Sequence, residues 1–192
     1  MSAQIQHLSH SFRTDAAHLI FKTRCASNPK AKGAPYPRTS YIAKLVVDAY
    51  MACECALKSM IASSNKTKSG ADVYTIIRQC GHDLRCLMKQ AKPLSISKDD
   101  RNFLKQASKR GVSFRYSFDL FSLTTCDFLP SDEVSFRLDP NYLAEFLRIA
   151  DLLAKEANER HVRDLGTQIF FSSRQKLKSY VKSLRDITAK RK

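Results

Sequence analysis

The sequence of 192 residues predicts a mainly α-helical protein: an antiparallel helical bundle with a small β-hairpin insertion and a basic C-terminal helix. Three observations lead to this fold class. Apolar residues recur at spacings of three and four over long stretches, which is the period of a helix with one buried face. Between residues 112 and 138 the period changes to two, as in strands. The last segment is amphipathic and rich in lysine and arginine.

Two helices joined by a basic loop are expected in the first third of the chain. Residues 10–24 carry apolar side chains at helical spacing, and residues 27–37 form a loop rich in Pro and Gly. The strongest helical pattern covers residues 39–62, before a polar loop at 63–70. Its apolar stripe comprises Tyr41, Ile42, Leu45, Val46, Ala49, Tyr50, Cys53, Leu57, Met60 and Ile61.

Three shorter helices are expected next. Residues 72–79 form the first, which Gly81 closes. A second begins near His82 and ends before Pro93. The segment 97–100 (Ser-Lys-Asp-Asp) has the capping-box pattern of a helix start, and Gly111 follows where a helix end is expected.

The remaining elements complete the predicted bundle. Alternating apolar and polar residues predict a hairpin of strands 112–124 and 133–138, which needs a helical surface to lie on because two strands alone are marginal. Asp139 and Pro140 start a helix that runs to about residue 160. A basic amphipathic helix is expected over 172–188. The predicted parts are therefore an N-terminal helix and loop (1–36), the bundle with hairpin 112–138 (37–165), and a basic C-terminal helix and tail (166–192).

Composition and charge narrow the class of protein. The chain has 33 Lys and Arg against 18 Asp and Glu, for a formal net charge of +15. No apolar run of about 18 residues predicts a membrane span. The first residues do not resemble a secretory signal, so a cytoplasmic location is expected. Only five Gly occur, which argues against a Gly-rich nucleotide loop.

The six cysteines are expected to be small apolar residues in a reducing compartment rather than disulfide partners. No Cys-x-x-Cys pair occurs. Cys53 and Cys55 are two residues apart and point in nearly opposite directions on a helix, so they cannot clamp one ion. No metal site and no cofactor are therefore predicted.

Two motifs together resemble a known family. A long helix carries Glu54 within Ala-Cys-Glu-Cys-Ala-Leu-Lys, and a polar loop separates it from Gly-His-Asp-Leu at residues 81–84; Arg115 and Tyr116 follow further along. This succession, over roughly residues 38–120, resembles the GHDL-containing branch of the HEPN superfamily (higher eukaryotes and prokaryotes nucleotide-binding). The resemblance implies a HEPN-like helical bundle that often dimerises.

Many HEPN proteins are metal-independent ribonucleases of toxin and defence systems, whose motif is Arg followed by His after four to six residues. Here Arg78 and His82 are separated by three residues, one short of that spacing, whereas Arg13 and His18 fit it outside the matched region. On the ribonuclease hypothesis His82 transfers protons and Arg78 clamps the phosphate beside Asp83. Arg115 or Arg85 supplements the charge. The alternative pair is Arg13 and His18.

Each of these residues also has a structural interpretation. His82 and Asp83 can serve to cap a helix, and Arg13 and His18 can be surface residues. Glu54 and Lys58, four residues apart, are expected to form a solvated ion pair.

The positive charge gathers around residues 22–44 and 174–192 and predicts an acidic partner. Nucleic acid is favoured, RNA in particular, with an acidic antitoxin-like protein as a further candidate; membrane binding is not expected. A homodimer follows from the family resemblance. The alternative to an enzyme is a non-catalytic basic module that binds or scaffolds. The residues expected to contact nucleic acid are Lys30, Lys32, Arg38, Arg115, Lys176, Lys178, Lys182 and Arg185.

Overall fold

The structure, a computed structural model, describes residues 2–27, 38–109 and 140–165, and within these ranges it contains helices and no strand. The predicted mainly α bundle is therefore confirmed for the described part. The predicted hairpin 112–138 and helix 172–188 lie outside the described residues. The helices are α1 (Ala3–Ser27), α2 (Arg38–Ser64), α3 (Gly70–Cys80), α4 (Leu84–Ala91), α5 (Lys98–Lys109) and α8 (Pro140–Leu165).

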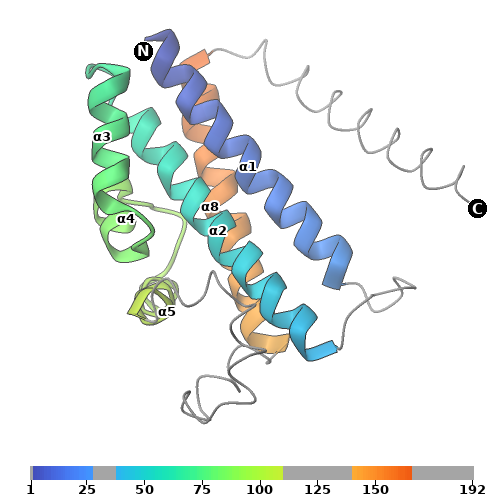
Figure 1. Cartoon of the computed structure of the whole chain (residues 1–192). Helices are drawn as coiled ribbons and strands as arrows, with labels where there is room; N and C mark the ends of the chain where they lie inside the picture. Colours follow the sequence, from blue (N-terminus) through green and yellow to red (C-terminus); the bar gives the residue numbers. More distant parts are fainter. Residues whose placement is uncertain (1, 28–37, 110–139, 166–192) are drawn as a thin grey trace, which may run out of the picture.

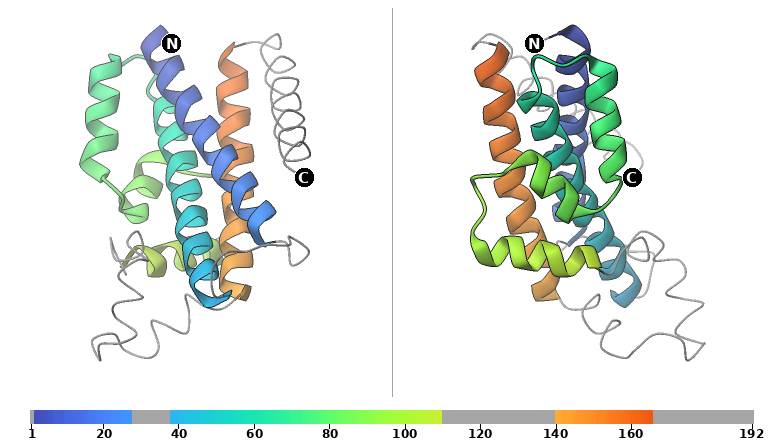
Figure 2. Two further views of the ribbon diagram at one scale, coloured as in Figure 1. Left: turned by 45° about the vertical axis from the view of Figure 1, so that its right-hand side comes forward. Right: turned by 90° about the vertical axis from the view of Figure 1, so that its left-hand side faces the viewer.

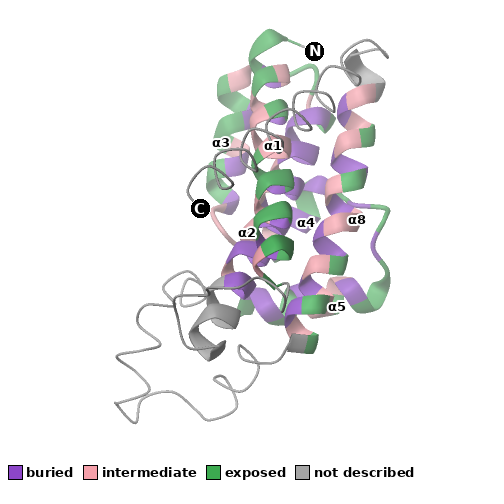
Figure 3. Cartoon of the chain, turned by 90° about the vertical axis from the view of Figure 1, so that its right-hand side faces the viewer, coloured by how far each residue is buried: buried purple, intermediate pink, exposed green. Residues whose placement is uncertain are grey.

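Three long helices, α1, α2 and α8, lie side by side and form the body of the molecule (Figure 1). The shorter α3 and α4 pack beside α2, and α5 crosses one end of the bundle (Figure 2). Helix α2 is central because its apolar residues face neighbours on several sides. From Leu45 to Ser63 most of its side chains are buried, among them Ala49, Cys53 and Leu57. Figure 3 shows buried residues along the inner faces of the long helices.

Aromatic packing joins α2, α5 and α8 at one end of the bundle. Phe146 of α8 is fully buried, and its ring lies 4.8 Å from Phe103 and 5.1 Å from Tyr142, both in edge-to-face geometry. Tyr50 of α2 lies 6.1 Å away on another side. Edge-to-face pairs at these distances add to the free energy gained by burying the rings.

Helix α1 begins earlier than the predicted boundary at residue 10. Ile5 and Ser9 are buried and continue the stripe formed by Ala16, Ile20 and Thr23, so the contact with the bundle extends through two further turns. The sequence pattern missed this start because the buried position 9 holds a polar residue. Among the described residues, no helix combines the length and the apolar character needed to cross a bilayer.

The short helices begin at side-chain caps. Ser69 Oγ accepts a hydrogen bond from the backbone N–H of Asp72 at the start of α3. At the start of α5, Ser97 Oγ accepts from the N–H of Asp100, whose carboxylate accepts from the N–H of Ser97. This reciprocal pair is the capping box that the sequence predicts, with Asp in place of Glu.

Two carboxylates, one on α8 and one on α5, fix the segment between α4 and α5 through contacts with α8. The buried Glu156 of α8 accepts hydrogen bonds from the backbone N–H groups of Leu94 and Ser95 at 2.8–3.0 Å. Arg160 donates to the carbonyl of Ala91 at 2.8 Å and pairs with Glu156. Arg148 pairs with the buried Asp100. The C-terminal end of α4 and the N-terminal end of α5 are therefore both bound to α8.

Candidate functional site

The turn between α3 and α4 carries the Gly-His-Asp-Leu motif. Gly81 closes α3 with a positive φ of 57°, a conformation that favours glycine, and its N–H donates to the carbonyl of Arg78 at 3.0 Å. Asp83 then caps α4 by accepting from the N–H of Arg85 at 2.9 Å. His82 is therefore placed between two helix ends whose directions are fixed locally.

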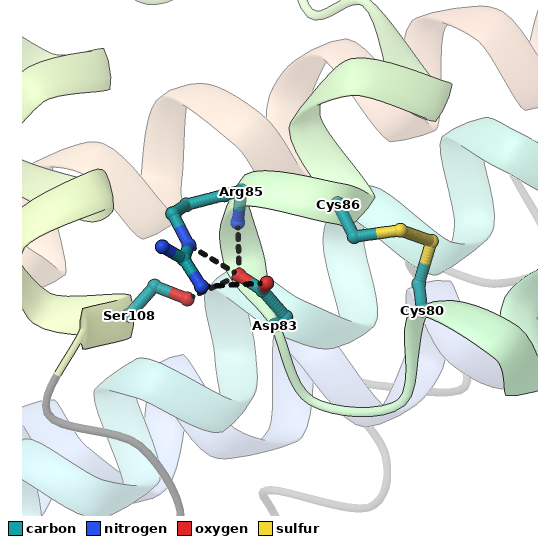
Figure 4. Close-up of a disulfide and its surroundings, with 5 residues drawn as sticks. All are labelled: Cys80, Asp83, Arg85, Cys86 and Ser108. Atoms are coloured by element: carbon teal, nitrogen blue, oxygen red, sulfur yellow. Dashed lines mark hydrogen bonds and ion pairs between the residues drawn. A yellow bond between two sulfur atoms is a disulfide. The ribbon is translucent and has the colours of Figure 1, made fainter.

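A disulfide closes this turn, which corrects the expectation that the cysteines are unpaired. Cys80 at the end of α3 is bonded to Cys86 in the first turn of α4, six positions later (Figure 4). The pairing was not predicted because Cys80 and Cys86 lack Cys-x-x-Cys spacing and a reducing compartment was expected. The turn after Gly81 brings two cysteines together at a longer spacing. Among the described residues, Cys25, Cys53 and Cys55 are not part of a disulfide.

Removal of this disulfide is expected to lower the free energy of unfolding by about 2 kcal/mol, because closing a loop of this length removes that much chain entropy from the unfolded state. The change is Cys80→Ser with Cys86→Ser, measured by urea denaturation without reductant. Cys25→Ser, at an exposed free thiol, is the matched control and should leave stability unchanged. Equal stability of the double variant and the parent would contradict the prediction.

His82 lies against a buried acid–base pair from α2. Its Nδ1 is 2.7 Å from Oε1 of Glu54, and the same oxygen is 2.6 Å from Nζ of Lys58. The Glu54 side chain is 6% exposed and that of Lys58 is 12% exposed, whereas His82 is 37% exposed. The prediction of a solvated Glu54–Lys58 pair is therefore wrong: the pair is buried where α2 meets Phe12 of α1 and His82 of the turn before α4.

This arrangement determines which nitrogen of His82 can react. A carboxylate ionised beside Lys58 only accepts hydrogen bonds, so Nδ1 of His82 carries the hydrogen. The second nitrogen, Nε2, is then the basic atom of the neutral ring. A carboxylate that accepts from one imidazole nitrogen orients the ring and fixes its tautomer. Oε2 of Glu54 is buried without a hydrogen-bond partner among the described residues.

Tyr50 holds the backbone of the same turn. Its hydroxyl donates to the carbonyl of His82 at 2.7 Å. Burial raises the pKa of Tyr50 to about 12, so the hydroxyl keeps the proton that it donates.

Lys58 also contacts α1. Its Nζ lies 5.8 Å from the centre of the Phe12 ring, a cation–π distance. The turn and the buried pair are thus tied to both α1 and α2.

The Asp83 carboxylate is occupied by structural contacts. Besides capping α4, it accepts from the Arg85 guanidinium at 3.1 Å and from the Ser108 hydroxyl of α5 at 2.6 Å (Figure 4). Desolvation alone would raise the pKa of Asp83, but these hydrogen bonds outweigh it and the pKa lies at about 2. Asp83 thus acts as the helix cap that one interpretation of the sequence predicts.

Acid is expected to weaken the fold partly through Asp83. Its pKa of about 2 in the folded state lies below the unfolded value near ~3.9, so its contribution is present above about pH 4 and is lost as the pH falls through 2. In Asp83→Asn, urea unfolding between pH 5 and pH 2 should show a smaller loss of stability than in the parent. Asp100 and Glu156, whose pKa values are also lowered, keep the remaining dependence. The same dependence of the free energy of unfolding on pH in Asp83→Asn and in the parent would contradict the prediction.

The other predicted site residues are placed as follows. Arg78 is exposed on the last turn of α3, and no hydrogen bond joins it to His82 within the described part of the chain. Arg13 is half-buried and directs its guanidinium to Asn158 and His10, whereas His18 lies on the exposed side of α1. The guanidinium of Arg13 is therefore hydrogen-bonded to Asn158 and His10, and not to His18.

Most of the residues predicted to bind nucleic acid are not covered by the structure. Arg38 belongs to α2, without a described side chain; the others lie outside the described residues, namely Lys30, Lys32, Arg115, Lys176, Lys178, Lys182 and Arg185. Over ranges 2–27, 38–109 and 140–165 no group of three His, Cys, Asp or Glu side chains could hold a metal ion.

Taken together, the site defines a helical-bundle protein with a carboxylate-held, partly exposed histidine in a disulfide-closed turn. Comparisons of the chain with protein-family models, curated proteins and solved structures find no match.

The site contacts of four residues of this region were not predicted from the sequence: Ser108, Tyr50, Cys80 and Cys86. Ser108 and Tyr50 act only through contacts between helices, and neither has a spacing that singles it out. Cys80 and Cys86 did carry a signal: two cysteines flank a Gly-His-Asp turn, and a turn with glycine can bring both ends within bonding distance.

Proposed function

We propose that the chain is a HEPN-like RNA-binding protein with metal-independent endoribonuclease activity centred on His82. The observation that carries this proposal is the contact between Nδ1 of His82 and the buried carboxylate of Glu54, which leaves the other ring nitrogen of a partly exposed histidine available. The two motifs on which the family resemblance depends, Glu54 and the Gly-His-Asp-Leu turn, are in contact here, and this supports the proposal.

The chemistry requires a base for the 2′-hydroxyl proton of RNA. Histidine suits this step because its ordinary pKa lies near ~6.5. In the proposed reaction Nε2 of His82 accepts the proton, the 2′-oxygen attacks the phosphorus, and the bond from phosphorus to the 5′-oxygen breaks. The 5′-oxygen leaves with a proton from the protonated His82 of the second copy in the proposed homodimer. Glu54 acts as a positioning residue, because it holds the ring and does not face the substrate.

The reaction also needs a cation beside the phosphate. Arg85 is engaged by Asp83, and Lys58 is engaged by Glu54, so both charges are already compensated. Arg78 is exposed four positions before His82 and is the cation that we assign to the phosphate. The formal charge of +15 supports binding of the rest of the RNA backbone. A homodimer and an acidic antitoxin-like partner complete the proposal.

Incubation of the purified chain with labelled RNA in EDTA tests the activity. His82→Ala should lower the cleavage rate by about 100-fold or more, the usual contribution of a general base. Glu54→Gln should reduce the rate and shift its pH profile while leaving RNA binding intact. The matched control is His18→Ala, which should cleave as the parent does.

Intact RNA in the parent, with binding that weakens steeply as salt rises and is unchanged in His82→Ala, would overturn the enzymatic part. That outcome would support the second candidate, a non-catalytic basic module, which the excess of 33 basic over 18 acidic residues favours independently of the site. Affinity for an acidic protein without affinity for RNA would contradict RNA binding and would leave the non-catalytic module with a protein partner.

A further inference from the structure

A second polar cluster lies where α1 meets α8. It consists of Ser9, His10 and Arg13 of α1 with Asn158 and His161 of α8, and we call it the α1–α8 cluster. NH1 of Arg13 donates to Oδ1 of Asn158 at 2.6 Å, and NH2 lies 2.9 Å from Nδ1 of His10. The rings of His10 and His161 are 5.9 Å apart. None of these residues belongs to the His82 site.

The positive charge of Arg13 has no acidic partner in the described part of the chain. Four other arginines do pair with a carboxylate: Arg24, Arg85, Arg148 and Arg160. Among the described residues, the hydrogen-bond partners of the Arg13 side chain are an amide and an imidazole, although Arg13 is half-buried and burial lowers its pKa. A buried cation without a counter-charge is costly, so a bound anion would stabilise it.

Hydrogen-bond donors remain available at the same place. A guanidinium has five N–H groups, and two of those of Arg13 are used by Asn158 and His10. The Nε of Arg13 is buried and has no hydrogen-bond partner among the described residues, so the donors left for a ligand are the remaining N–H groups of NH1 and NH2. Arg13 donates to Nδ1 of His10, so the neutral His10 ring carries its own hydrogen on Nε2. Arg13 and the exposed His10 thus offer donors from two sides.

Buried hydroxyl groups support the cluster from behind. Ser9 Oγ lies 3.0 Å from Nδ1 of His161 and 2.8 Å from Oγ of Ser63. The hydroxyl of Ser59 donates to the carbonyl of Ser9 at 3.0 Å. Ser9, Ser59 and His161 are all at most 2% exposed. These contacts fix α1 on α2 and α8, so Arg13 and His10 are held in place before any ligand arrives.

We propose that the α1–α8 cluster binds a phosphate group, with Arg13 as the anchor and His10 as the second donor. A guanidinium fork with adjacent N–H donors matches the oxygens of phosphate. Two sources share this chemistry, a terminal phosphomonoester on a nucleotide or RNA end and a phosphodiester within an RNA strand. The proposal does not depend on catalysis at His82, because the two sites share no residue.

Titration of the full chain with inorganic phosphate tests the site. The readout is the NMR signal of the His10 imidazole at low ionic strength, with matched additions of chloride to separate general salt effects. A saturable shift is expected. Arg13→Gln should raise the dissociation constant at least about tenfold, equivalent to 1.4 kcal/mol. Lys105→Gln, at an exposed lysine of α5, should leave it unchanged.

Asn158→Asp is a second variant that keeps Arg13 in place. It puts a carboxylate where the amide now accepts from Arg13, so it should weaken phosphate binding at least about tenfold while the chain stays folded. This variant keeps the test decisive if Arg13→Gln destabilises the bundle. The proposal would be overturned if phosphate shifted the His10 signal no more than chloride does. It would also be overturned if neither variant changed the affinity for phosphate.

Two further arms identify the source of the phosphate. A nucleoside 5′-monophosphate and a short RNA with or without a 5′-phosphate are each titrated against the parent and Arg13→Gln. Binding that needs both Arg13 and the 5′-phosphate assigns a phosphomonoester. Equal Arg13-dependent binding of both RNAs assigns the phosphodiester backbone. RNA binding at this site that is lost with Arg13 but retained in His82→Ala distinguishes it from the proposed catalytic site.

Discussion

Phe146→Ala is expected to lower the free energy of unfolding by about 3–5 kcal/mol, the usual cost of removing a buried aromatic ring. Phe146 is fully buried, and three other aromatic rings lie within 6.1 Å of its centre. Because these rings come from α2, α5 and α8, the cavity would loosen all three helices. Urea denaturation followed by circular dichroism measures the change.

Phe21→Ala provides the matched control. It removes the same side chain from α1, where Phe21 is 44% exposed, so the expected loss is below about 1 kcal/mol. Equal losses in the two variants would contradict the assignment of Phe146 to the centre of the core.

Glu54→Ala is expected to cost about 3 kcal/mol, because removal of one partner leaves the other charge of a buried pair without compensation. Lys58 would retain its charge at a position that is 12% exposed, and Nδ1 of His82 would lose its acceptor. Denaturation at neutral pH measures the loss.

A double-mutant cycle with Lys58→Met separates the ion pair from the packing of the two stems. The double variant should recover part of the stability lost in Glu54→Ala, since the unpaired ammonium is gone. Asp15→Ala, an exposed acid on α1, is the control and should change stability by less than about 0.5 kcal/mol. Additive effects of Glu54 and Lys58 would show that the pair does not interact energetically.

Helix positions followed from the sequence where apolar periodicity and capping residues agree. The predicted range 39–62 became α2, and the Ser97–Asp100 box formed as expected, because both signals are local. The start of α1 was misplaced because Ser9 is buried through hydrogen bonds to other helices. A hydropathy pattern contains no information about such a partner.

The candidate site was predictable only in part. His82 and Asp83 were identified, and the capping role of Asp83 follows from its place before an apolar helical stripe. The contact between His82 and Glu54 is tertiary, since Glu54 lies 28 positions earlier on another helix. The same holds for Arg13 and Asn158, which are 145 positions apart. The spacing of Glu54 and Lys58 predicts an ion pair, but the low exposure of the pair depends on the packing of the other helices and cannot be derived from the spacing.

Helix α8 packs on α1 and α2 although it lies far from them in the sequence, and this affects the chain during its synthesis. Helices α1 and α2 can pair early, but the face of α2 that receives Phe146 stays uncovered until α8 has been synthesised. At translation rates of ~5–20 residues per second, the interval from Ser64 to Pro140 lasts roughly 4–15 seconds. During that interval an apolar surface is open to other nascent chains. The order of the helices along the chain therefore makes the emergence of α8 the step that ends exposure to aggregation.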